Sequence, residues 1–588
     1  MYHNVDLDAP ASSALGQSCE TEVPNRFLHL DPTKLRGGYY TPTELADWIV
    51  AWCVRSSTDE VLEPSSGDGR FLEAVGRRLS LLGAPTISIA KQITGVEVAE
   101  VEAEKAVAAL RTVIGLDANE AVIVSDFFEW WHRSGRGLFD AVVGNPPFIR
   151  YQSFPEPHRG HAMKVLRDLG LHPNKLTNSW VPFVAASVRA LRPGGRIGFV
   201  LPAELLQVTY AAQLRTFLVE NFREIHILTC NELFFDKAEQ EVVVLLADGA
   251  LTKSDPKNDC AVAVSVTDTA KSLLSTPAAT YIQMTPKKHV RHNDEKWLKY
   301  FLSQKQIDLL RDLRELGTVQ TLGSYGSVDV GIVTGRNEFF VVSGSQAKRW
   351  NLEQFLVPLA ARAAHLKGAA FTKADWTSLA TDDERVYLLQ LGRTEAGSLP
   401  QEALAYVKQG EEASYHLGYK CSIRAPWYDV PAVWAPDAFL FRQIHEFPRL
   451  VLNEAQAVCT DTIHRFRLHR STAEKVLTNS YTSLTGASAE IEGRSYGGGV
   501  LELEPTEAER VLVPSVGCGG LSLIEIDRMV RAGRLHDVID LNDREILGQQ
   551  LGLSAGDRQL LRDAWDTMRQ RRTSRSRRAL SKKHMTRD

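Results

Sequence analysis

The sequence predicts an α/β protein in which a doubly wound, mostly parallel sheet of seven strands precedes an α+β region. Between residues 35 and 250, short runs rich in β-branched residues alternate with segments of helical periodicity. A turn containing Gly67 and Gly69 follows the first such run. After about residue 250 the alternation ends, and glycine, proline and aromatic residues become frequent. We therefore expect an N-terminal arm (1–34), an α/β domain (35–250), an α+β domain (251–515) and a helical segment (516–588).

Seven segments of the α/β domain have the composition of strands. In chain order they are residues 60–62, 93–97, 121–125, 139–144, 196–201, 224–228 and 241–247. The last two lie too close together for a helical crossover, which predicts an antiparallel hairpin at one edge of the sheet. Residues 252–259 are polar and contain Pro256, so we expect a linker there. Asn542 and Ser554, each followed three residues later by an acidic residue, predict two helix starts near the C-terminal end.

Composition is typical of a soluble globular protein with more than one domain. The 588 residues exceed what one hydrophobic core usually supports, and 44% are hydrophobic against 24% charged. No run approaches the roughly 18 apolar residues of a membrane-spanning helix. Residues 1–20 lack the basic start and apolar stretch of a signal peptide. The seven cysteines are scattered without a C-x-x-C pair, which favours reduced thiols in the cytoplasm and predicts no metal site.

The formal net charge of −4 neither indicates nor excludes nucleic-acid binding, because the local field depends on where charges cluster. Nine Lys and Arg residues lie between Arg569 and Asp588, with Asp588 as the single acidic residue. A solvated tail and a phosphate-binding tail are both compatible with this cluster.

The first candidate site is the glycine turn in Glu63-Pro64-Ser65-Ser66-Gly67-Asp68-Gly69. Glycines let the backbone approach a ligand, and the helix that follows offers unpaired N–H groups. Taken alone, the turn also suits a strand-to-helix connection without a ligand, and dinucleotide-binding proteins have similar turns.

Two later positions point to a nucleotide-like ligand. Glu97 ends the second strand, where its carboxylate can accept hydrogen bonds from both hydroxyls of a ribose. Asp126 ends the third strand and precedes Phe127, so a carboxylate can accept from an adenine amino group while a ring covers its face. Helix capping is the alternative for each acidic residue separately. Three acidic residues at neighbouring strand ends nonetheless favour ligand binding in the crevice of the sheet.

The most specific motif is Asn145-Pro146-Pro147-Phe148, directly after the strand at 139–144. Neither proline has an N–H, and the stiff turn presents the carbonyls of Asn145 and Pro146. Two fixed oxygen acceptors can hold both N–H bonds of an exocyclic amine and aim its nitrogen at a methyl donor, while Phe148 stacks on the base. Such catalysis relies on positioning and polarisation, and it requires the base to leave a duplex. A rigid strand-to-helix turn is the alternative.

With these motifs in this order, the sequence resembles the gamma class of adenine-N6 DNA methyltransferases from restriction–modification systems. Gly38-Tyr39-Tyr40-Thr41-Pro42 is similar to the family's N-terminal cofactor motif, residues 63–69 to its glycine loop and residues 145–148 to its catalytic motif. The resemblance implies the methyltransferase fold with S-adenosylmethionine as cofactor. It also implies that Thr41 and Pro42 contact the methionine part of the cofactor, Glu97 the ribose, and Asp126 with Phe127 the adenine, with Tyr40 as a further cofactor-binding residue.

Further segments resemble the same family. Residues 192–202 are similar to its fifth-strand segment, and residues 231–235 precede the last strand, where the family has an aromatic residue that packs against the flipped adenine. The resemblance assigns this role to Phe234, with core packing as the alternative. Residues 328–342, 419–428 and 460–465 resemble segments of target-recognition domains, and no base contact is assigned to them.

Other functions use parts of the same pattern. A dehydrogenase would share the glycine turn and Glu97 but has no use for Asn-Pro-Pro-Phe. Methyltransferases acting on RNA adenine or on a protein glutamine amide would use the same local chemistry, but more than 300 residues follow the catalytic domain, which favours DNA. The intact motif argues against a non-enzymatic DNA-binding subunit, and no fused nuclease is expected.

The resemblance therefore implies a site-specific adenine methyltransferase acting on double-stranded DNA. It further implies a separately encoded restriction endonuclease as partner, no membrane association, and a monomer or weak dimer.

Overall fold

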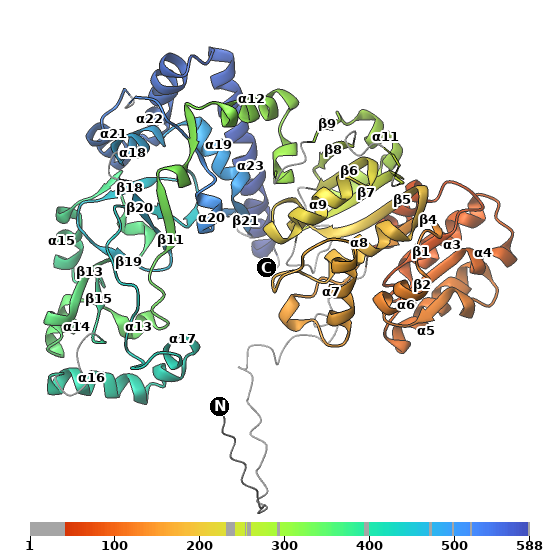
Figure 1. Cartoon of the computed structure of the whole chain (residues 1–588), viewed down its shortest axis with the longest axis horizontal. Coiled ribbons are helices and arrows are strands. Elements are labelled where there is room, and N and C mark those ends of the chain that lie inside the picture. Colours follow the sequence, from red (N-terminus) through yellow and green to blue (C-terminus); the bar gives the residue numbers. More distant parts are fainter. Residues whose placement is uncertain are drawn as a thin grey trace, which may run out of the picture.

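The computed structural model describes residues 41–230, 241–252, 254–255, 260–290, 295–392, 399–469, 473–496, 499–517 and 520–585. They form two lobes (Figure 1), of which the first carries one large sheet and the second several smaller ones.

The N-terminal lobe is built on a nine-stranded sheet in the order β3-β2-β1-β4-β5-β7-β6-β8-β9. The strands are β1 (Val61–Glu63), β2 (Ile93–Glu97), β3 (Val122–Val124), β4 (Phe139–Gly144), β5 (Leu191–Pro202), β6 (Phe222–Cys230), β7 (Val242–Ala250), β8 (Ala261–Thr267) and β9 (Lys288–His289). β1 pairs in parallel with β2 and β4, and β4 with β5, whereas β7 runs antiparallel between β5 and β6. All seven predicted strands are present, and the predicted hairpin is β6–β7.

The predicted extent of this sheet is wrong. β8 pairs in parallel with β6, and β9 pairs antiparallel with β8, so the sheet has nine strands and the β6–β7 hairpin lies inside it. The predicted domain boundary at residues 250–251 falls between two strands of one sheet, and the N-terminal domain extends to about residue 290. The polar stretch before Ala261 has the composition of an interdomain linker, although Val262 and Val264 beyond it are buried.

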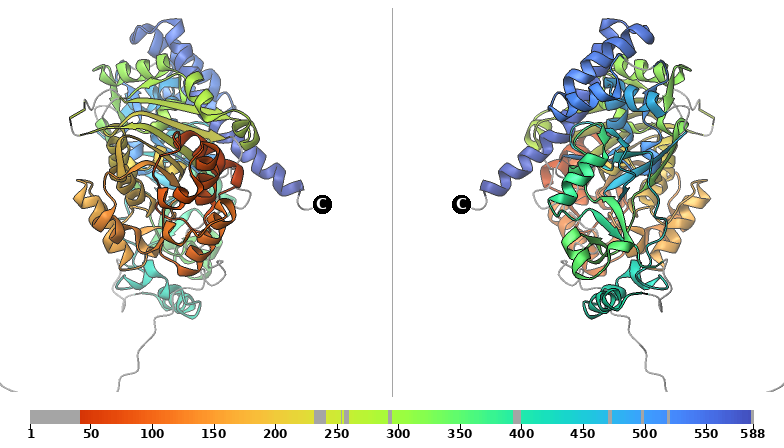
Figure 2. Two further views of the ribbon diagram at one scale, coloured as in Figure 1. Left: turned by 90° about the vertical axis from the view of Figure 1, so that its right-hand side faces the viewer. Right: turned by 90° about the vertical axis from the view of Figure 1, so that its left-hand side faces the viewer.

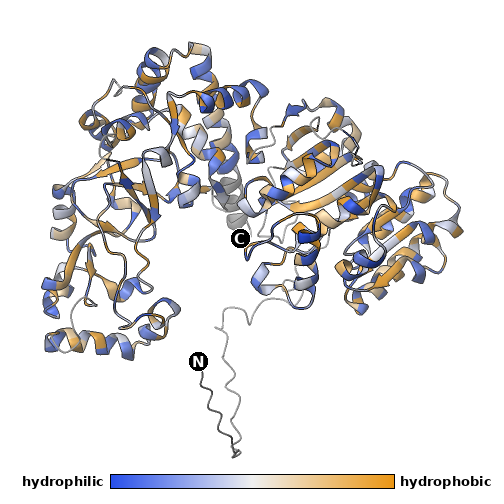
Figure 3. Ribbon diagram, viewed as in Figure 1, coloured by the Kyte–Doolittle hydropathy of each residue, from blue (hydrophilic) through white to orange (hydrophobic). Residues whose placement is uncertain are grey.

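Helices cover both faces of the sheet, as the doubly wound prediction requires. α2 (Thr43–Cys53), α3 (Arg70–Leu81) and α5 (Glu100–Ile114) pack on one face. α6 (Phe127–Ser134), α8 (Trp180–Ala190) and α9 (Ala212–Val219) pack on the other. The remaining helices are α4 (Thr86–Gln92), α7 (His158–Asp168), α10 (Ala270–Leu274) and α11 (Ala278–Met284). Because both faces are covered, the central strands are apolar along their length, as Figure 3 shows.

The C-terminal lobe mixes small sheets with helices, as predicted. Its larger sheets have the orders β11-β20-β16-β18-β14 and β12-β15-β13-β19. The strands are β10 (Val319–Thr321), β11 (Gly326–Val330), β12 (Val341–Val342), β13 (Leu356–Ala360), β14 (Ala370–Phe371), β15 (Tyr387–Leu389), β16 (Ala438–Phe441), β17 (Gln443–Ile444), β18 (Leu450–Asn453), β19 (Val458–Cys459), β20 (Ile463–Leu468), β21 (Arg494–Tyr496), β22 (Val500–Glu502) and β23 (Leu512–Pro514). The helices are α12 (Gln304–Glu315), α13 (Asn337–Phe340), α14 (Gly344–Arg349), α15 (Lys373–Thr381), α16 (Gln401–Glu412), α17 (Tyr419–Ser422), α18 (Ala473–Asn479), α19 (Ser483–Glu492), α20 (Pro505–Ala508), α21 (Leu523–Arg531), α22 (Leu535–Asn542) and α23 (Ala555–Met585).

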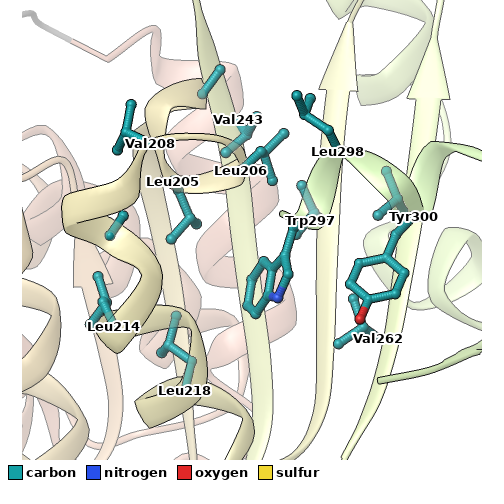
Figure 4. Close-up of a cluster of buried hydrophobic side chains, with 14 of the residues drawn as sticks. Leu205, Leu206, Val208, Leu214, Leu218, Val243, Val262, Trp297, Leu298 and Tyr300 are labelled. Atoms are coloured by element: carbon teal, nitrogen blue, oxygen red, sulfur yellow. The ribbon is translucent and has the colours of Figure 1, made fainter. Parts of the chain in front are cut away.

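One hydrophobic core connects the two lobes. Trp297 and Tyr300, on a short helix between the lobes, pack with Leu205, Leu206 and Val262 of the N-terminal lobe (Figure 4). The same core continues through α12 and α19 to α23. The predicted boundary at residues 515–516 therefore does not separate an independent segment, because α23 packs along α19 before it extends past the body of the molecule (Figure 2).

One of the two predicted helix starts is correct. Ser554 and Asp557 bond reciprocally at the start of α23, where each backbone N–H donates to the other side chain. Asn542 instead ends α22, and its fully buried side chain donates to the carbonyls of Thr478 and Tyr481. The helical path then continues through residues 543–550, so no cap is formed there.

Asp543 makes stability depend on pH, and replacing it by asparagine tests this. Its Oδ1 accepts a hydrogen bond of 2.9 Å from the Ser483 N–H, but burial raises its pKa from 3.8 to about 6. The pKa of Asp543 is higher in the folded chain than in the unfolded chain. Its contribution to the free energy of unfolding is therefore complete below about pH 4 and is lost as pH rises through 6. We expect Asp543→Asn to raise the free energy of unfolding at pH 8 by about 2–3 kcal/mol, measured by urea denaturation.

The control for this prediction is Asp540→Asn, at an exposed carboxylate in α22 that pairs with Arg562. It should change stability by less than about 1 kcal/mol. Equal effects of the two substitutions at pH 8, or an unchanged pH profile for Asp543→Asn between pH 4 and 7, would contradict the role given to burial.

Candidate active site

A cavity of about 520 Å³ lies at the carboxyl ends of β1, β2, β3 and β4. Nine of the predicted site residues line it: Thr41, Glu63, Pro64, Gly67, Glu97, Asp126, Phe127, Asn145 and Pro147. Four others are described by the structure but do not line it: Pro42, Gly69, Pro146 and Phe148. Tyr40 and Phe234 lie outside the described residues. The size of the cavity is within the usual range for small-molecule sites.

The glycine turn is bonded directly to the second strand. The Gly67 N–H donates to Oε2 of Glu97 at 2.9 Å, and the Ser66 N–H donates to the carbonyl of Val96 at 3.0 Å. Gly67 and Gly69 both have positive φ, of 51° and 86°. A Cβ on Gly69 would lie 2.6 Å from Cα of Ala106 in α5. Gly69 is therefore required for helix packing, and its contact with the cofactor stays a prediction.

Glu97 organises the turn as well as facing the cavity. Its two carboxylate oxygens accept hydrogen bonds of 2.9 Å from the N–H groups of Gly67 and Ala99. Each carboxylate oxygen has a second lone pair, so these bonds leave acceptor capacity for the hydroxyls of a ligand.

Glu63 has the chemistry of a residue that binds an N–H or cationic group. It is 3% exposed, and its Oε2 has no hydrogen-bond partner within the described part of the chain. Burial, together with the carboxylates of Asp68 and Glu97, raises the pKa of Glu63 well above its ordinary value. An amino group bound in the cavity would supply the missing partner, and S-adenosylmethionine carries one.

Asp126 combines the helix-capping role with a place in the cavity wall. Its Oδ1 accepts from the Glu129 N–H at 2.8 Å and caps α6, while its Oδ2 lies 2.5 Å from Nδ1 of His158. Phe127 stacks on Phe183 with ring centroids 5.2 Å apart and planes within 9° of parallel. This arrangement gives one wall of the cavity a carboxylate beside an apolar surface, which suits an adenine ring.

The Asn145–Pro147 part of the catalytic motif is held on two sides. Nδ2 of Asn145 donates to Oγ1 of Thr41 at 3.3 Å, which joins the catalytic motif to the N-terminal cofactor motif. The Ser179 hydroxyl donates to the carbonyl of Pro147 and accepts from the Ile149 N–H. Ser179 precedes α8 directly, so this helix fixes the exit of the loop.

Several residues of the cavity wall were not predicted from the sequence. His158 and Phe154 come from the segment that enters α7, Phe183 comes from α8, and Ile149 directly follows the catalytic motif. Neither α7 nor α8 carries a motif that a sequence pattern would single out, since their contributions depend on how both helices fold back over the sheet.

No group of three or more His, Cys, Asp or Glu side chains is arranged to hold a metal ion in the part of the chain that the structure describes. Within the same residues, every helix is too short or too polar to cross a lipid bilayer.

Two family models match the chain, one on each lobe. The model described as "Eco57I restriction-modification methylase" matches residues 89–235. The model described as "Type II methyltransferase M.Eco57I, C-terminal domain" matches residues 294–547.

Several curated proteins are similar to the chain. Type II methyltransferase M.AccI of Acinetobacter calcoaceticus is 23% identical over 511 residues, which cover 84% of this chain and 88% of that protein. Type II methyltransferase M.XamI of Xanthomonas campestris pv. amaranthicola is 23% identical over 494 residues, covering 82% and 85%. Among solved structures, that of the type IIL restriction-modification enzyme MmeI in complex with DNA has a TM-score of 0.49 and 11% identity, covering 90% of this chain and 75% of that chain.

Proposed function

Because the chain belongs to the Eco57I family of restriction–modification methylases, we propose that it methylates N6 of adenine in double-stranded DNA. It is a DNA methyltransferase of the restriction–modification type that uses S-adenosylmethionine, and relatives that align with more than four-fifths of its length are type II methyltransferases. Adenine as the methylated base, N6 as the methylated atom and the residues that act on them are what we propose beyond this family membership.

The observation that carries the proposal is the position of Asn145 beside the residues expected to bind the cofactor. Asn145 and Pro147 line the same cavity as Glu63, Glu97 and Asp126, and the bond from Asn145 to Thr41 fixes the plane of its side-chain amide. The side-chain carbonyl oxygen of Asn145 and the backbone carbonyl oxygen of Pro146 would accept the N–H bonds of the adenine amine and orient its lone pair. When bound, S-adenosylmethionine supplies an electrophilic methyl group.

The cavity walls fit the parts of S-adenosylmethionine. Glu63 offers an unpartnered buried carboxylate oxygen for the amino group, and Glu97 offers acceptors for the ribose hydroxyls. Asp126 beside Phe127 and Phe183 forms a polar edge and an apolar face for the adenine ring. Thr41, 5% exposed, lines the same cavity and accepts the hydrogen bond from Asn145.

The acceptor base must leave its duplex to reach such a cavity, at a cost of a few kcal/mol. Phe148 is assigned to stacking on that base; it lies outside the cavity wall in this structure and packs partly buried against both cores of the N-terminal lobe. Phe234 is assigned to packing against the same base. A separately encoded endonuclease as partner, and a monomer or weak dimer, complete the proposal.

Mapping methylated bases in living cells tests the proposal. The chain is expressed in a bacterial host that lacks its own DNA methyltransferases, and the genome is sequenced by a method that distinguishes N6-methyladenine from N4-methylcytosine. We expect N6-methyladenine at one fixed position of a recurring sequence, and none in cells that express Asn145→Ala. Methylation of cytosine instead would refute the choice of base, and unmodified DNA from cells with folded protein would refute the activity.

Replacing Glu97 by alanine should weaken S-adenosylmethionine binding by about 10- to 100-fold. The variant loses the acceptors for the ribose and also the two bonds to Gly67 and Ala99, each hydrogen bond to a charged group being worth about 1.5–3 kcal/mol. Titration calorimetry with the full-length chain measures this. Glu100→Ala, at an exposed carboxylate at the start of α5, is the matched control. An affinity of Glu97→Ala within twofold of the control would remove Glu97 from the site.

A further inference from the structure

The C-terminal lobe brings together three segments that lie far apart in the sequence. The Gly331 and Ile332 N–H groups donate to the carbonyls of Ile463 and Cys459, at 3.1 and 2.8 Å. The guanidinium of Arg424 donates to the carbonyls of Thr334 and Val333, both at 2.8 Å. Residues 331–337, 415–424 and 459–463 therefore form one bonded unit, although they span more than 100 residues of the chain.

This unit carries large apolar side chains that the lobe does not cover. Leu417, Tyr419 and Ile423 are 67%, 74% and 64% exposed, and all three lie on or beside α17. Val333 of the neighbouring loop is also exposed. Exposed apolar clusters with polar neighbours are typical of interaction sites. We call Val333, Arg336, Leu417, Tyr419, Lys420 and Ile423 the α17 surface.

The charge of this surface is positive. The three segments of the unit contain Arg336, Lys420 and Arg424 against one acidic residue, Asp461, and the exposed Glu338 directly follows the first segment. Arg424 is used to join the two loops, whereas Arg336 and Lys420 are exposed. A partner for the α17 surface must therefore be anionic and also offer apolar contacts close to its charges. Duplex DNA has both, since sugar and base edges lie between two rows of phosphates.

The α17 surface is also rigidly supported. Below it, Phe339 stacks on Tyr406 with ring centroids 4.7 Å apart and contacts Trp427 at 4.8 Å. Cβ of Lys420 and Sγ of Cys421 approach Gly335 so closely that a Cβ there would lie 2.9 and 3.2 Å from them. Such a fixed surface loses little conformational entropy on binding. Figure 1 places α17 at the end of the C-terminal lobe, on the side turned towards α7 of the N-terminal lobe.

We propose that the α17 surface contacts double-stranded DNA, with Arg336 and Lys420 at phosphates and Tyr419, Leu417 and Ile423 against sugar and base edges in a groove. This inference rests on the proposed function and assigns part of its DNA interface to particular residues. The contacts of Arg336 and Lys420 with phosphates depend on salt, whereas the apolar contacts in the groove do not.

Two single substitutions test both kinds of contact. Lys420→Ala and Ile423→Ser are compared with Lys367→Ala and Ile524→Ser, which change exposed residues elsewhere on the C-terminal lobe. The affinity of each full-length variant for a duplex containing the mapped methylation site is measured over a range of salt, with S-adenosylhomocysteine present. Far-ultraviolet circular dichroism and affinity for S-adenosylhomocysteine report whether each variant is folded.

Lys420→Ala should weaken binding at low salt about fivefold and reduce the slope of log K against log salt by about 0.9, the value for one lost phosphate contact. Ile423→Ser should weaken binding about fivefold without changing that slope, and both controls should bind within twofold of the wild type. Wild-type affinity and slope in Lys420→Ala and Ile423→Ser would overturn the inference while leaving the proposed function intact. A wild-type chain that does not bind the duplex would overturn both.

Discussion

Asn145→Ala is expected to lower the rate of methyl transfer by about 1000-fold and to leave the affinity for S-adenosylmethionine within threefold of the wild type. The substitution removes the side-chain amide that holds the amine, so the loss concerns the reacting nitrogen and not the cofactor. In the structure, the amide also bonds to Thr41, and that single neutral bond contributes about 1 kcal/mol. Single-turnover rates with saturating DNA measure the chemical step, and calorimetry measures the cofactor affinity.

Asn119→Ala is the matched control, since Asn119 lies on an exposed turn before β3 and outside the cavity. It should react at the wild-type rate. A rate for Asn145→Ala within tenfold of the wild type would contradict the catalytic role of the loop. A loss of cofactor affinity equal to the loss in rate would instead assign Asn145 to cofactor binding.

Arg572→Met is expected to lower the free energy of unfolding by about 3–5 kcal/mol. Arg572 of α23 is 2% exposed and bonds to both carboxylate oxygens of Glu490 in α19, at 2.6 and 3.0 Å. It also donates to the carbonyls of Ile444, His445 and Gly499. The substitution leaves a buried carboxylate and three carbonyls without their donor, and urea denaturation of the full-length chain measures the result.

The pH dependence of this loss has a definite sign. Burial already raises the pKa of Glu490 in the wild-type chain, and removal of Arg572 raises it further. A raised folded-state pKa stabilises the protein at low pH and loses that contribution as pH rises, so Arg572→Met should be less damaging at pH 5 than at pH 8.

Adding Glu490→Gln to Arg572→Met should restore part of the stability at pH 8. Arg569→Met, which breaks a partly exposed pair with Asp566, should cost less than about 1 kcal/mol. Equal losses from Arg569→Met and Arg572→Met would contradict the account.

The central sheet could be predicted from the sequence because burial on both faces imposes a local pattern. β1 to β6 are apolar runs separated by helices, β7 follows β6 as a hairpin, and each strand lies within a few residues of its predicted position. β8 could not be predicted in the same way. It pairs with β6 across a chain segment whose composition is that of a linker, and pairing of distant strands depends on the tertiary fold rather than on local composition.

The candidate site was predictable where its residues follow strands. Glu63, Glu97, Asp126 and Asn145 come at the carboxyl ends of β1, β2, β3 and β4, and parallel pairing brings these ends together. Residues that reach the cavity from α7 and α8, such as His158 and Phe183, carry no such signal. The packing role of Gly69 could not be predicted either, because it depends on the approach of α5 to the turn.

The basic residues near the C-terminal end were compatible with a solvated tail and with a phosphate-binding tail. The structure shows a third role for three of them. Arg569, Arg571 and Arg572 pair with Asp566, Glu241 and Glu490, so they contribute to the fold. Sequence composition alone could not predict these three pairs, because they depend on how α23 packs in the folded molecule.

The most direct test of the central claim is to identify the methylated nucleoside. The purified full-length chain is incubated with duplex DNA and S-adenosylmethionine carrying a labelled methyl group, and the DNA is then digested and its nucleosides separated. RNA and a protein extract serve as parallel acceptors, and Asn145→Ala serves as the blank. The account predicts that the label appears in N6-methyldeoxyadenosine from the DNA alone. Label in a methylated cytosine, or in RNA or protein, would contradict it.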